Sequence, residues 1–436
     1  MSWRARWARF WFAPSAPDGL GLGRLTFFSL LFLYYVRVDF SAWGGVDGAF
    51  WLPITVFRIL HIPALSIGLL FVVQCVWKVS LVLAALGLFT RLSTLTAFIG
   101  GFYLFGLPNN FGKTHHTETV LVFALGFLCV SHCGHAWSID SIIRAARGGS
   151  RPALSGEYTW PIRAVWMTFA LIFFAAGVAK LRHGGLEWVF SDNLARLLAQ
   201  GPYRIYAVDP IGPLGTYLAQ FGVLTCVLAA ASVLLEISYP LALFSRHARW
   251  IIVPGSAGMQ LGIRILMGPS FDQYFIAYTF WVPWALLATL LARRSPTRAM
   301  LFDGNCGLCQ RSVGVIECLD VLHAIAFYDV RNDWQRTMAR FPGLTQIACL
   351  EEMHVIAGER VATGFHAYRE LAWTLPALWL VLPLLYVPGV PLLGQRVYRR
   401  VAARRLLRGC PVPQVATLPS LNVSNTTRQG HGAARR

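Results

Sequence analysis

The chain has 436 residues, of which 56% are hydrophobic and only 13% are charged. Soluble domains usually carry about 25% charged residues, so this composition excludes an ordinary soluble enzyme and indicates a protein with many membrane-spanning segments. The net charge is +18, from 38 basic and 20 acidic residues. Because the basic residues fall in short segments between apolar runs, they favour lipid headgroups and cytoplasmic loops, and we expect no nucleic-acid partner.

Residues 1–19 form a basic N-terminal segment rich in tryptophan. Four aromatic residues recur at helical spacing among three arginines in the stretch WRARWARFWF. This pattern is typical of a helix that lies among lipid headgroups. A basic cytoplasmic tail would have the same composition, so both interpretations stay open.

Residues 20–292 contain a series of apolar runs. A helix needs about 20 apolar residues to cross the hydrocarbon layer, and eight runs approach that length. We therefore predict a polytopic α-helical membrane domain with about eight transmembrane helices. The runs cover residues 20–38, 64–88, 92–107, 117–133, 160–181, 216–244, 250–267 and 273–292.

The distribution of basic residues predicts the orientation of this domain. Cytoplasmic loops are enriched in lysine and arginine, and the side that includes the N-terminus carries the excess. That side has Arg4, Arg6, Arg9, Arg91, Arg144, Arg147, Arg151, Arg163, Arg246, Arg249, Arg293, Arg294 and Arg298. The other side has Arg58, Lys113, Arg182, Arg196 and Arg204. We expect a multi-pass protein of a bacterial inner membrane with both termini in the cytoplasm.

The last third of the chain has the pattern of a small α/β domain. After a linker at residues 293–299, residues 300–409 predict, in order, a strand, a helix, a strand, a helix, a β-hairpin and a final helix. The polar tail at residues 410–436 is low in aromatic residues, and we expect it to be disordered.

Two cysteines lie three positions apart at the start of this domain, in LFDGNCGLC. A cysteine at the N-terminus of a helix is stabilised as the thiolate by the helix dipole, so Cys306 would attack and Cys309 would resolve. Half of a zinc site and an inert pair are the alternatives. No second CxxC or HxxxH follows to complete a zinc site.

The segment resembles the DCC family of thioredoxin-like proteins, whose signature is D-G-x-C-x-x-C. Asp303, Cys306 and Cys309 fit that signature, and VYRRVA at residues 397–402 fits a later pattern of the family. The resemblance implies a thioredoxin-like fold and a thiol-disulfide oxidoreductase that acts on a thiol or disulfide protein partner. No proline precedes the expected strand at Met353, where thioredoxins place a cis-proline. In a reducing cytosol the pair would rest as a dithiol.

Ionisable residues within apolar runs are costly and therefore suggest function. Lys180 ends the fifth run, Glu236 lies in the sixth, and His115 and His116 precede the fourth. Each also has a structural explanation. Lys180 can extend its amine to the membrane surface, Glu236 can pair with a neighbouring helix, and the histidines can occupy an exposed loop.

Together these residues resemble the HTTM family, the membrane domain shared with vitamin K-dependent gamma-carboxylase. The motifs are AGVAKL at residues 176–181, the following Glu187-Trp188, and Glu236 with Pro240. The resemblance implies that Lys180 is the base that deprotonates a quinol. It also implies that His116, Glu236 and Trp188 contribute to the binding site. A quinone or quinol is therefore the one cofactor that we expect.

A second cluster, CVSHCGH at residues 129–135, could supply metal ligands. On a helix, however, His135 would point away from the face that Cys129, His132 and Cys133 share. We expect packing at the end of a span and no metal site.

Three functions are consistent with these observations. The first is a membrane-anchored thiol-disulfide oxidoreductase that uses the cytoplasmic dithiol and is coupled to a lipid-soluble quinone. The second is a carboxylase- or epoxidase-like enzyme that acts on a quinol with Lys180 as base. The third is a non-catalytic membrane protein that binds lipid or a partner and carries a redox-sensitive domain.

Overall fold

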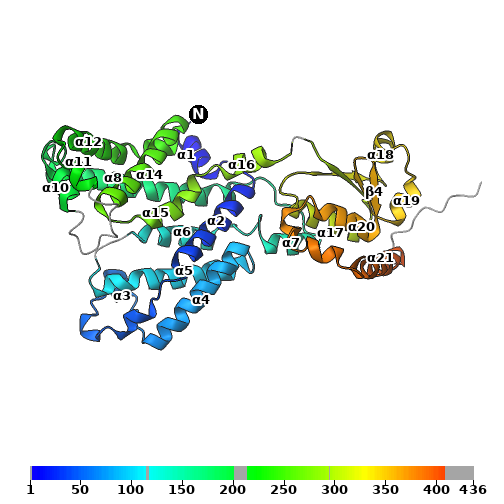
Figure 1. Ribbon diagram of the computed structural model, residues 1–436, viewed down its shortest axis with the longest axis horizontal. Helices are drawn as coiled ribbons and strands as arrows, with labels where there is room; N and C mark the ends of the chain where they lie inside the picture. The colour runs from blue at the N-terminus through cyan, green and yellow to red at the C-terminus, as the bar shows by residue number, and fades with distance from the viewer. Residues whose placement is uncertain (1, 114–116, 201–213, 294, 408–436) are drawn as a thin grey trace, which may run out of the picture. The chain divides into compact units, whose positions relative to one another are not determined.

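The computed structural model describes residues 2–113, 117–200, 214–293 and 295–407. Contacts divide the chain into two compact units (Figure 1). The helical unit comprises residues 1–295 with 311–324, and the sheet unit comprises residues 296–310 with 325–436. His116 and the tail at 410–436, for which the sequence made predictions, lie outside the described residues.

The helical unit consists of α-helices joined by short 3-10 turns, and each of the eight apolar runs overlaps at least one helix. The elements are α1 (Trp3–Phe12), α2 (Asp18–Tyr35), η1 (Ser41–Gly45), η2 (Gly48–Phe50), α3 (Thr55–Ile59), α4 (Ile67–Leu86), α5 (Thr90–Gly106), η3 (Leu107–Phe111), α6 (Thr119–Val130), α7 (Ile139–Ala146), η4 (Gly156–Tyr158), α8 (Trp160–Gly184), α9 (Glu187–Phe190), α10 (Asn193–Gln200), α11 (Leu214–Leu218), α12 (Gly222–Ser238), α13 (Leu241–Phe244), α14 (Arg246–Met267), α15 (Asp272–Ala277), η6 (Tyr278–Trp281) and α16 (Trp284–Leu291).

Three helical segments of the described chain are long and apolar enough to cross a membrane: Ile67–Leu86, Gly156–Gly184 and Arg246–Met267. The bent pair Asp272–Trp281 and Trp284–Leu291, which turns through 64°, makes a fourth if it counts as one span. The prediction of eight spans is therefore not confirmed. Helices α6 and α12 are apolar but only 12 and 17 residues long, and α2 includes the charged residues Asp18 and Arg24.

Helix α4 has one buried and one exposed apolar face. Leu70, Trp77 and Leu81 are fully buried in the core of the helical unit. Phe71 and Val79, on the other side of the helix, leave 56% and 58% of their surfaces exposed. Monomeric soluble proteins rarely expose continuous apolar surface of this kind, so this face of α4 requires an apolar environment.

Arg24 of α2 is fully buried. Within the described residues, its guanidinium donates hydrogen bonds only to backbone carbonyls. Its Nε donates to the Cys133 carbonyl at 3.1 Å, and Nη1 donates to Ala85 at 2.8 Å and to Ala84. Nη2 donates to the carbonyl of Trp137. Because Ala84 and Ala85 are near the end of α4, this arginine supplies donors to carbonyls of the last turn, where a helix has no N–H groups of its own in the following turn. The Ala84 carbonyl also accepts from the Gly87 N–H at 3.2 Å.

The sheet unit contains a four-stranded mixed sheet in the order β2-β1-β3-β4. Strand β1 pairs parallel with β2 and antiparallel with β3, and β3 forms a hairpin with β4. From residue 298 onward the elements are β1 (Arg298–Phe302), α17 (Gly307–Leu319), β2 (Ile325–Asp329), α18 (Trp334–Arg340), α19 (Gln346–Glu351), β3 (His354–Ala357), β4 (Arg360–Thr363), α20 (Gly364–Ala372), η7 (Pro376–Leu378), η8 (Leu382–Tyr386) and α21 (Val390–Leu407). Helix α17 begins in the sheet unit, and its residues from 311 onward belong to the helical unit.

The order of strands and helices predicted for residues 300–409 is present with two additions, because α19 precedes the hairpin and two helices, α20 and α21, follow it in place of one. Helix α18 packs on β2, α19 on β1, and α20 on β3 and β4. The buried side chains of Leu301, Ile356 and Leu350 join these layers into a small core. Pairing of β1 within the sheet therefore fixes the position of its last residue, Phe302, from which the loop that carries the dithiol starts.

Candidate functional site

The dithiol lies where β1 passes into α17. The backbone N–H of Cys306 donates to the Asp303 carbonyl at 3.1 Å, and the Cys306 carbonyl accepts from the Gln310 N–H at 3.0 Å. The second bond is the first of the helix, so Cys306 is the residue that caps α17 and Cys309 lies in its first turn. The predicted sequence of strand, dithiol and helix is therefore present.

The two cysteines differ in exposure. Cys306 is fully buried, whereas Cys309 is half-buried. The end of a helix favours the thiolate at Cys306, but exposure favours Cys309 as the sulfur that meets a partner. Attack by Cys306, the order predicted from sequence, therefore requires the loop to expose its sulfur.

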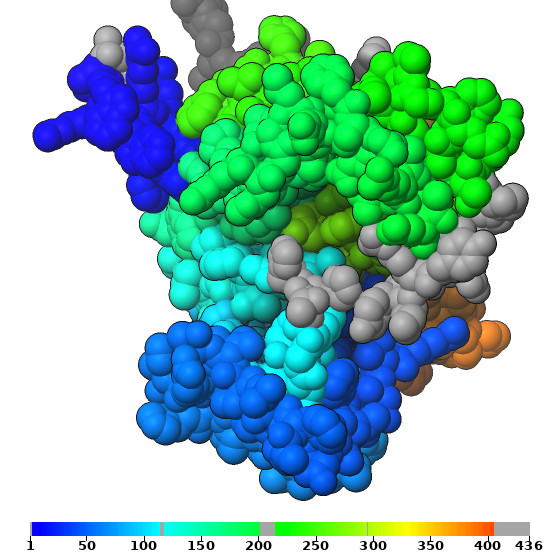
Figure 2. All heavy atoms as spheres, turned by 90° about the vertical axis from the view of Figure 1, so that its left-hand side faces the viewer, coloured from blue at the N-terminus to red at the C-terminus, as the bar shows by residue number. Residues whose placement is uncertain are grey.

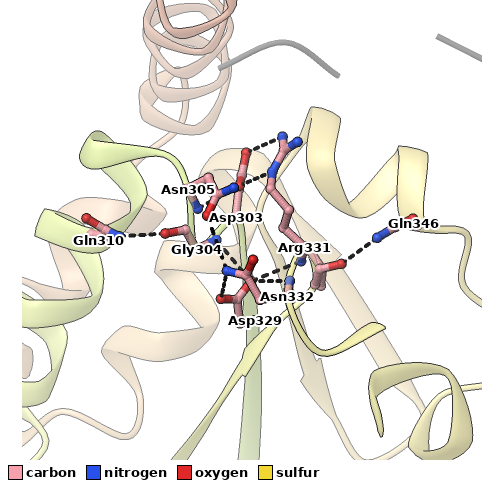
Figure 3. A network of polar contacts seen from close by, with 9 residues as sticks. Asp303, Gly304, Asn305, Gln310, Asp329, Arg331, Asn332 and Gln346 are labelled. Carbon is pink, nitrogen blue, oxygen red and sulfur yellow. Dashed lines mark hydrogen bonds and ion pairs between the residues drawn. The ribbon is translucent and has the colours of Figure 1, made fainter. Parts of the chain in front are cut away.

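Asp303, the first residue of the sequence signature, forms a buried bidentate ion pair with Arg331 (Figure 3). Arg331 Nε lies 2.7 Å from Oδ1 and Nη2 lies 2.9 Å from Oδ2. Asp303 is 2% exposed, and its Oδ1 also accepts from the Asn305 N–H at 3.1 Å. The carboxylate thus ties the loop to the chain that follows β2.

Asp329, the last residue of β2, holds the other side of the loop. Its Oδ1 accepts from the backbone N–H of Gly304 at 3.1 Å and of Arg331 at 2.9 Å, and its Oδ2 accepts from Asn332 Nδ2 at 2.7 Å. Burial alone would raise the pKa of Asp329, but the bonds from Asn332, Arg331 and Gly304 outweigh it and hold that pKa below its usual value. Asp329 therefore remains an acceptor at neutral pH.

Gly304 allows this close approach. A Cβ built at Gly304 would lie 1.8 Å from Asp329 Oδ2, a distance that no side chain can occupy. The Gly304 carbonyl accepts from Gln310 Nε2, which links the loop to the first turn of α17. The glycine of the signature is thus required for packing against a carboxylate.

In the helical unit, three of the predicted site residues converge. Lys180 of α8 forms an ion pair with Glu236 of α12, with Nζ 2.5 Å from Oε1. Its Nζ also lies 4.7 Å from the centre of the Trp188 ring. Glu236 is 5% exposed, and its Oε2 accepts no hydrogen bond from any residue that the structure describes.

Gly177 explains how α8 and α12 approach closely enough for this pair. A Cβ at Gly177 would lie 2.8 Å from Ile237 Cγ1 and 3.0 Å from Glu236 Cβ. The glycine of AGVAKL thus lets Lys180, one turn further along α8, reach Glu236. A pair between Glu236 and a neighbouring helix is also the structural explanation that the sequence analysis gave for this residue.

Residues 300–410 match the DCC1-like thiol-disulfide oxidoreductase family. The match begins in β1 and includes the dithiol loop, Arg331 and the sheet. Comparisons with curated proteins and with solved structures give no match.

The DCC1-like domain contains two further described cysteines outside its CxxC. Cys318 is exposed near the end of α17, and Cys349 is buried in α19. Burial raises the pKa of Cys349 to about 11, so this thiol stays protonated and unreactive at neutral pH. Among the described residues, no group of three or more cysteine, histidine and acidic side chains could hold a metal ion.

The backbone of Met353, the position that the sequence analysis compared with the cis-proline of thioredoxins, contacts a helix of the same segment. The backbone N–H of Met353, just before β3, donates to the Tyr398 hydroxyl at 2.8 Å. A proline at this position would have no N–H to donate. This backbone position is therefore bound to α21 of the same domain.

Sequence analysis identified Asp303, Cys306 and Cys309 but missed Asp329, Arg331 and Asn332. The parallel register places Phe302 opposite Asp329, so the chain leaves both strands at one edge of the sheet. An acidic residue at the end of each of two neighbouring strands, with an arginine two positions later, is the signal that could have found them.

Proposed function

We propose that the protein is a membrane-anchored thiol-disulfide oxidoreductase that exchanges electron pairs through Cys306 and Cys309. The dithiol at the start of α17, fixed by Asp303 and Arg331 within a segment that matches the DCC1-like family, is the observation that carries the proposal. The mixed sheet with its helices is consistent with the thioredoxin-like fold that the family resemblance implies. The substrate class is a protein disulfide or dithiol.

The proposed exchange balances as follows. The Cys306 thiolate attacks one sulfur of the substrate disulfide, so the substrate bond breaks, a mixed disulfide forms, and the first substrate thiolate leaves and takes up a proton. The Cys309 thiolate then attacks the Cys306 sulfur and releases the second substrate thiol. Two electrons pass to the substrate, and the domain is left as a disulfide for a thiol reductant to restore.

Membrane anchoring is part of the proposal. Three long apolar helices and the exposed apolar face of α4 support it, because hydrocarbon is the environment in which such surfaces are stable. The excess of arginine on one side of the helices supports a cytoplasmic dithiol. A thiol reagent that cannot cross bilayers should then label Cys306 and Cys309 only after cells are opened.

Trapping of mixed disulfides tests the exchange itself. If Cys306 attacks, full-length Cys309→Ser should accumulate a covalent complex with a disulfide-bonded protein substrate, because this variant keeps the attacking thiol and lacks the resolving one. Cys306→Ser lacks the attacking thiol and should accumulate no such complex. The complex is measured on non-reducing gels and by mass spectrometry of the joined peptides.

Cys318→Ser, which removes an exposed thiol of the same helix, serves as the control and should trap nothing. Trapping by Cys306→Ser alone would show that the more exposed Cys309 attacks first. If neither variant traps a complex, the proposal is wrong.

A second function is favoured by the convergence of Lys180, Glu236 and Trp188 in the helical unit. The residues fit a quinol. The buried Oε2 of Glu236 has no hydrogen-bond partner among the described residues and could accept a hydrogen bond from a quinol hydroxyl, and the Trp188 ring offers a face on which a quinol ring could stack. A bound quinol would supply a lipid-soluble carrier of electrons and protons. Lys180 would hold or take a proton at Nζ, which requires its pair with Glu236 to separate.

Substitution of Lys180 distinguishes this function from the first. Lys180→Met should abolish quinol-dependent activity of the membrane-embedded protein if Lys180 is the base, whereas Cys306→Ser should lower it only in part. Lys78→Met is the matched control, because Lys78 also lies in a long apolar helix but donates to the Val38 carbonyl at 2.7 Å. If no substitution alters any catalysed rate, the protein is a binding module whose sheet unit responds to redox state.

A further inference from the structure

Two arginines of the helical unit stack on one tryptophan. Arg163 lies in the first turn of α8 and Arg249 in the first turn of α14. Their guanidinium carbons are 4.3 Å and 4.1 Å from the centre of the Trp166 ring. Both side chains are half-buried, so two positive charges share one small, partly desolvated site.

The aromatic support of this site is rigid. Trp166 stacks on Trp281 with ring centres 4.5 Å apart and planes 2° from parallel. Its indole N–H donates to the Phe280 carbonyl at 2.8 Å. Phe10 of α1 lies 5.1 Å from the Arg163 guanidinium and packs on Phe244 at 5.3 Å. The two guanidiniums are therefore held in place by ring stacking.

No described carboxylate lies within ion-pair distance of either arginine. Arg249 uses Nε and Nη2 to donate to the carbonyls of Ala242 and Leu243, at 3.0 Å and 3.2 Å. The Arg163 guanidinium donates to no acceptor in the part of the chain that the structure describes, and its backbone N–H donates to the Thr159 carbonyl. Like charges in a partly desolvated site repel, and the N-termini of α8 and α14 add positive potential. The positive charge of the two guanidiniums is therefore not neutralised by any described carboxylate.

We propose that Arg163 and Arg249 bind the phosphate group of an anionic phospholipid. Arginine presents paired N–H donors that match phosphate oxygens, and helix N-termini bind such groups readily. The adjacent α1 supports a lipid source, because its Trp3 and Trp7 are 73% and 43% exposed and its exposed arginines lie among them. Figure 2 shows α1, in dark blue, beside the green helices of the unit.

Lipid retention tests this site. Full-length protein is extracted from nanodiscs of phosphatidylglycerol and phosphatidylcholine, and retained lipids are counted by native mass spectrometry. Wild type should retain one phosphatidylglycerol molecule. The double variant Arg163→Gln/Arg249→Gln should retain this lipid about tenfold less well, because it loses two charge-assisted contacts to the phosphate. The control Arg91→Gln/Arg147→Gln loses the same charge from exposed positions and should match wild type.

The source of the phosphate is decided by competition. If millimolar inorganic phosphate leaves the retained phosphatidylglycerol in place, the ligand is a lipid. If phosphate binds the detergent-solubilised wild type and no lipid is retained, the lipid assignment is wrong. Equal retention by wild type and the Gln/Gln variant also overturns the proposal. Should that variant not fold, Arg163→Gln alone, with Arg163→Lys as the charge-preserving comparison, gives the same test.

Discussion

Full-length protein that carries Cys306→Ser is expected to lose thiol-disulfide turnover entirely and to show only the uncatalysed rate. Both sulfurs are needed to form and then resolve the mixed disulfide, so a serine at either position stops the cycle. The measurement is the steady-state reduction of a protein disulfide by dithiothreitol, with the purified protein in detergent or in nanodiscs. The loss should appear in kcat, because the substituted oxygen cannot carry the covalent intermediate.

The matched control is Cys318→Ser, which removes an exposed thiol from the same helix and should keep the wild-type rate. Turnover by Cys306→Ser at the wild-type rate would leave the dithiol without a catalytic role. Such a result would shift attention to Lys180 and Glu236. A quinol-dependent rate that Cys306→Ser lowers only in part would also favour the function at Lys180 and Glu236.

Arg331→Gln is expected to destabilise the sheet unit by about 3 kcal/mol, because it leaves the buried Asp303 carboxylate without its counter-ion. The lower end of the usual range applies, since the Arg331 side chain keeps 20% of its surface exposed. Hydrogen exchange followed by mass spectrometry on the full-length protein should show faster exchange in β1, β2 and the dithiol loop. Exchange in α4 and α8 should not change.

A double-mutant cycle isolates the ion pair. Asp303→Asn/Arg331→Gln should be less destabilised than the sum of the two single variants, because neither side then buries an isolated charge. The amides of the double variant can still form one hydrogen bond. Additive effects of the two substitutions would mean that the pair contributes little coupling energy and that Asp303 acts through the Asn305 N–H instead.

The sequence was a good guide wherever local chemistry decides the structure. The hairpin of β3 and β4 was predictable because Gly358 takes a φ of +63°, which glycine adopts at little cost. The dithiol was predictable because its two cysteines and Asp303 lie within seven residues. Each of these features depends on neighbours in the chain.

The remaining features depend on contacts between distant residues. Asp329 and Arg331 join the dithiol loop only because the register places Phe302 opposite Asp329. Lys180 and Glu236 meet across 56 residues because Gly177 lets two helices approach. The number of spans predicted from the apolar runs is not confirmed, because apolar composition does not show where a helix ends. The run at 273–292, for example, bends by 64° between Trp281 and Trp284, where Pro283 lies.

Arg24 has a consequence for the order in which the helical unit is assembled. Its carbonyl acceptors, Ala84, Ala85, Cys133 and Trp137, lie 60 to 113 residues further along the chain. During synthesis α2 emerges first, so its guanidinium has to remain hydrated until the ribosome has delivered those later segments. Helix α2 can therefore reach its final packing only after α4 and the turn that follows α6 have arrived, and a chain truncated before residue 133 would leave this charge without its full set of acceptors.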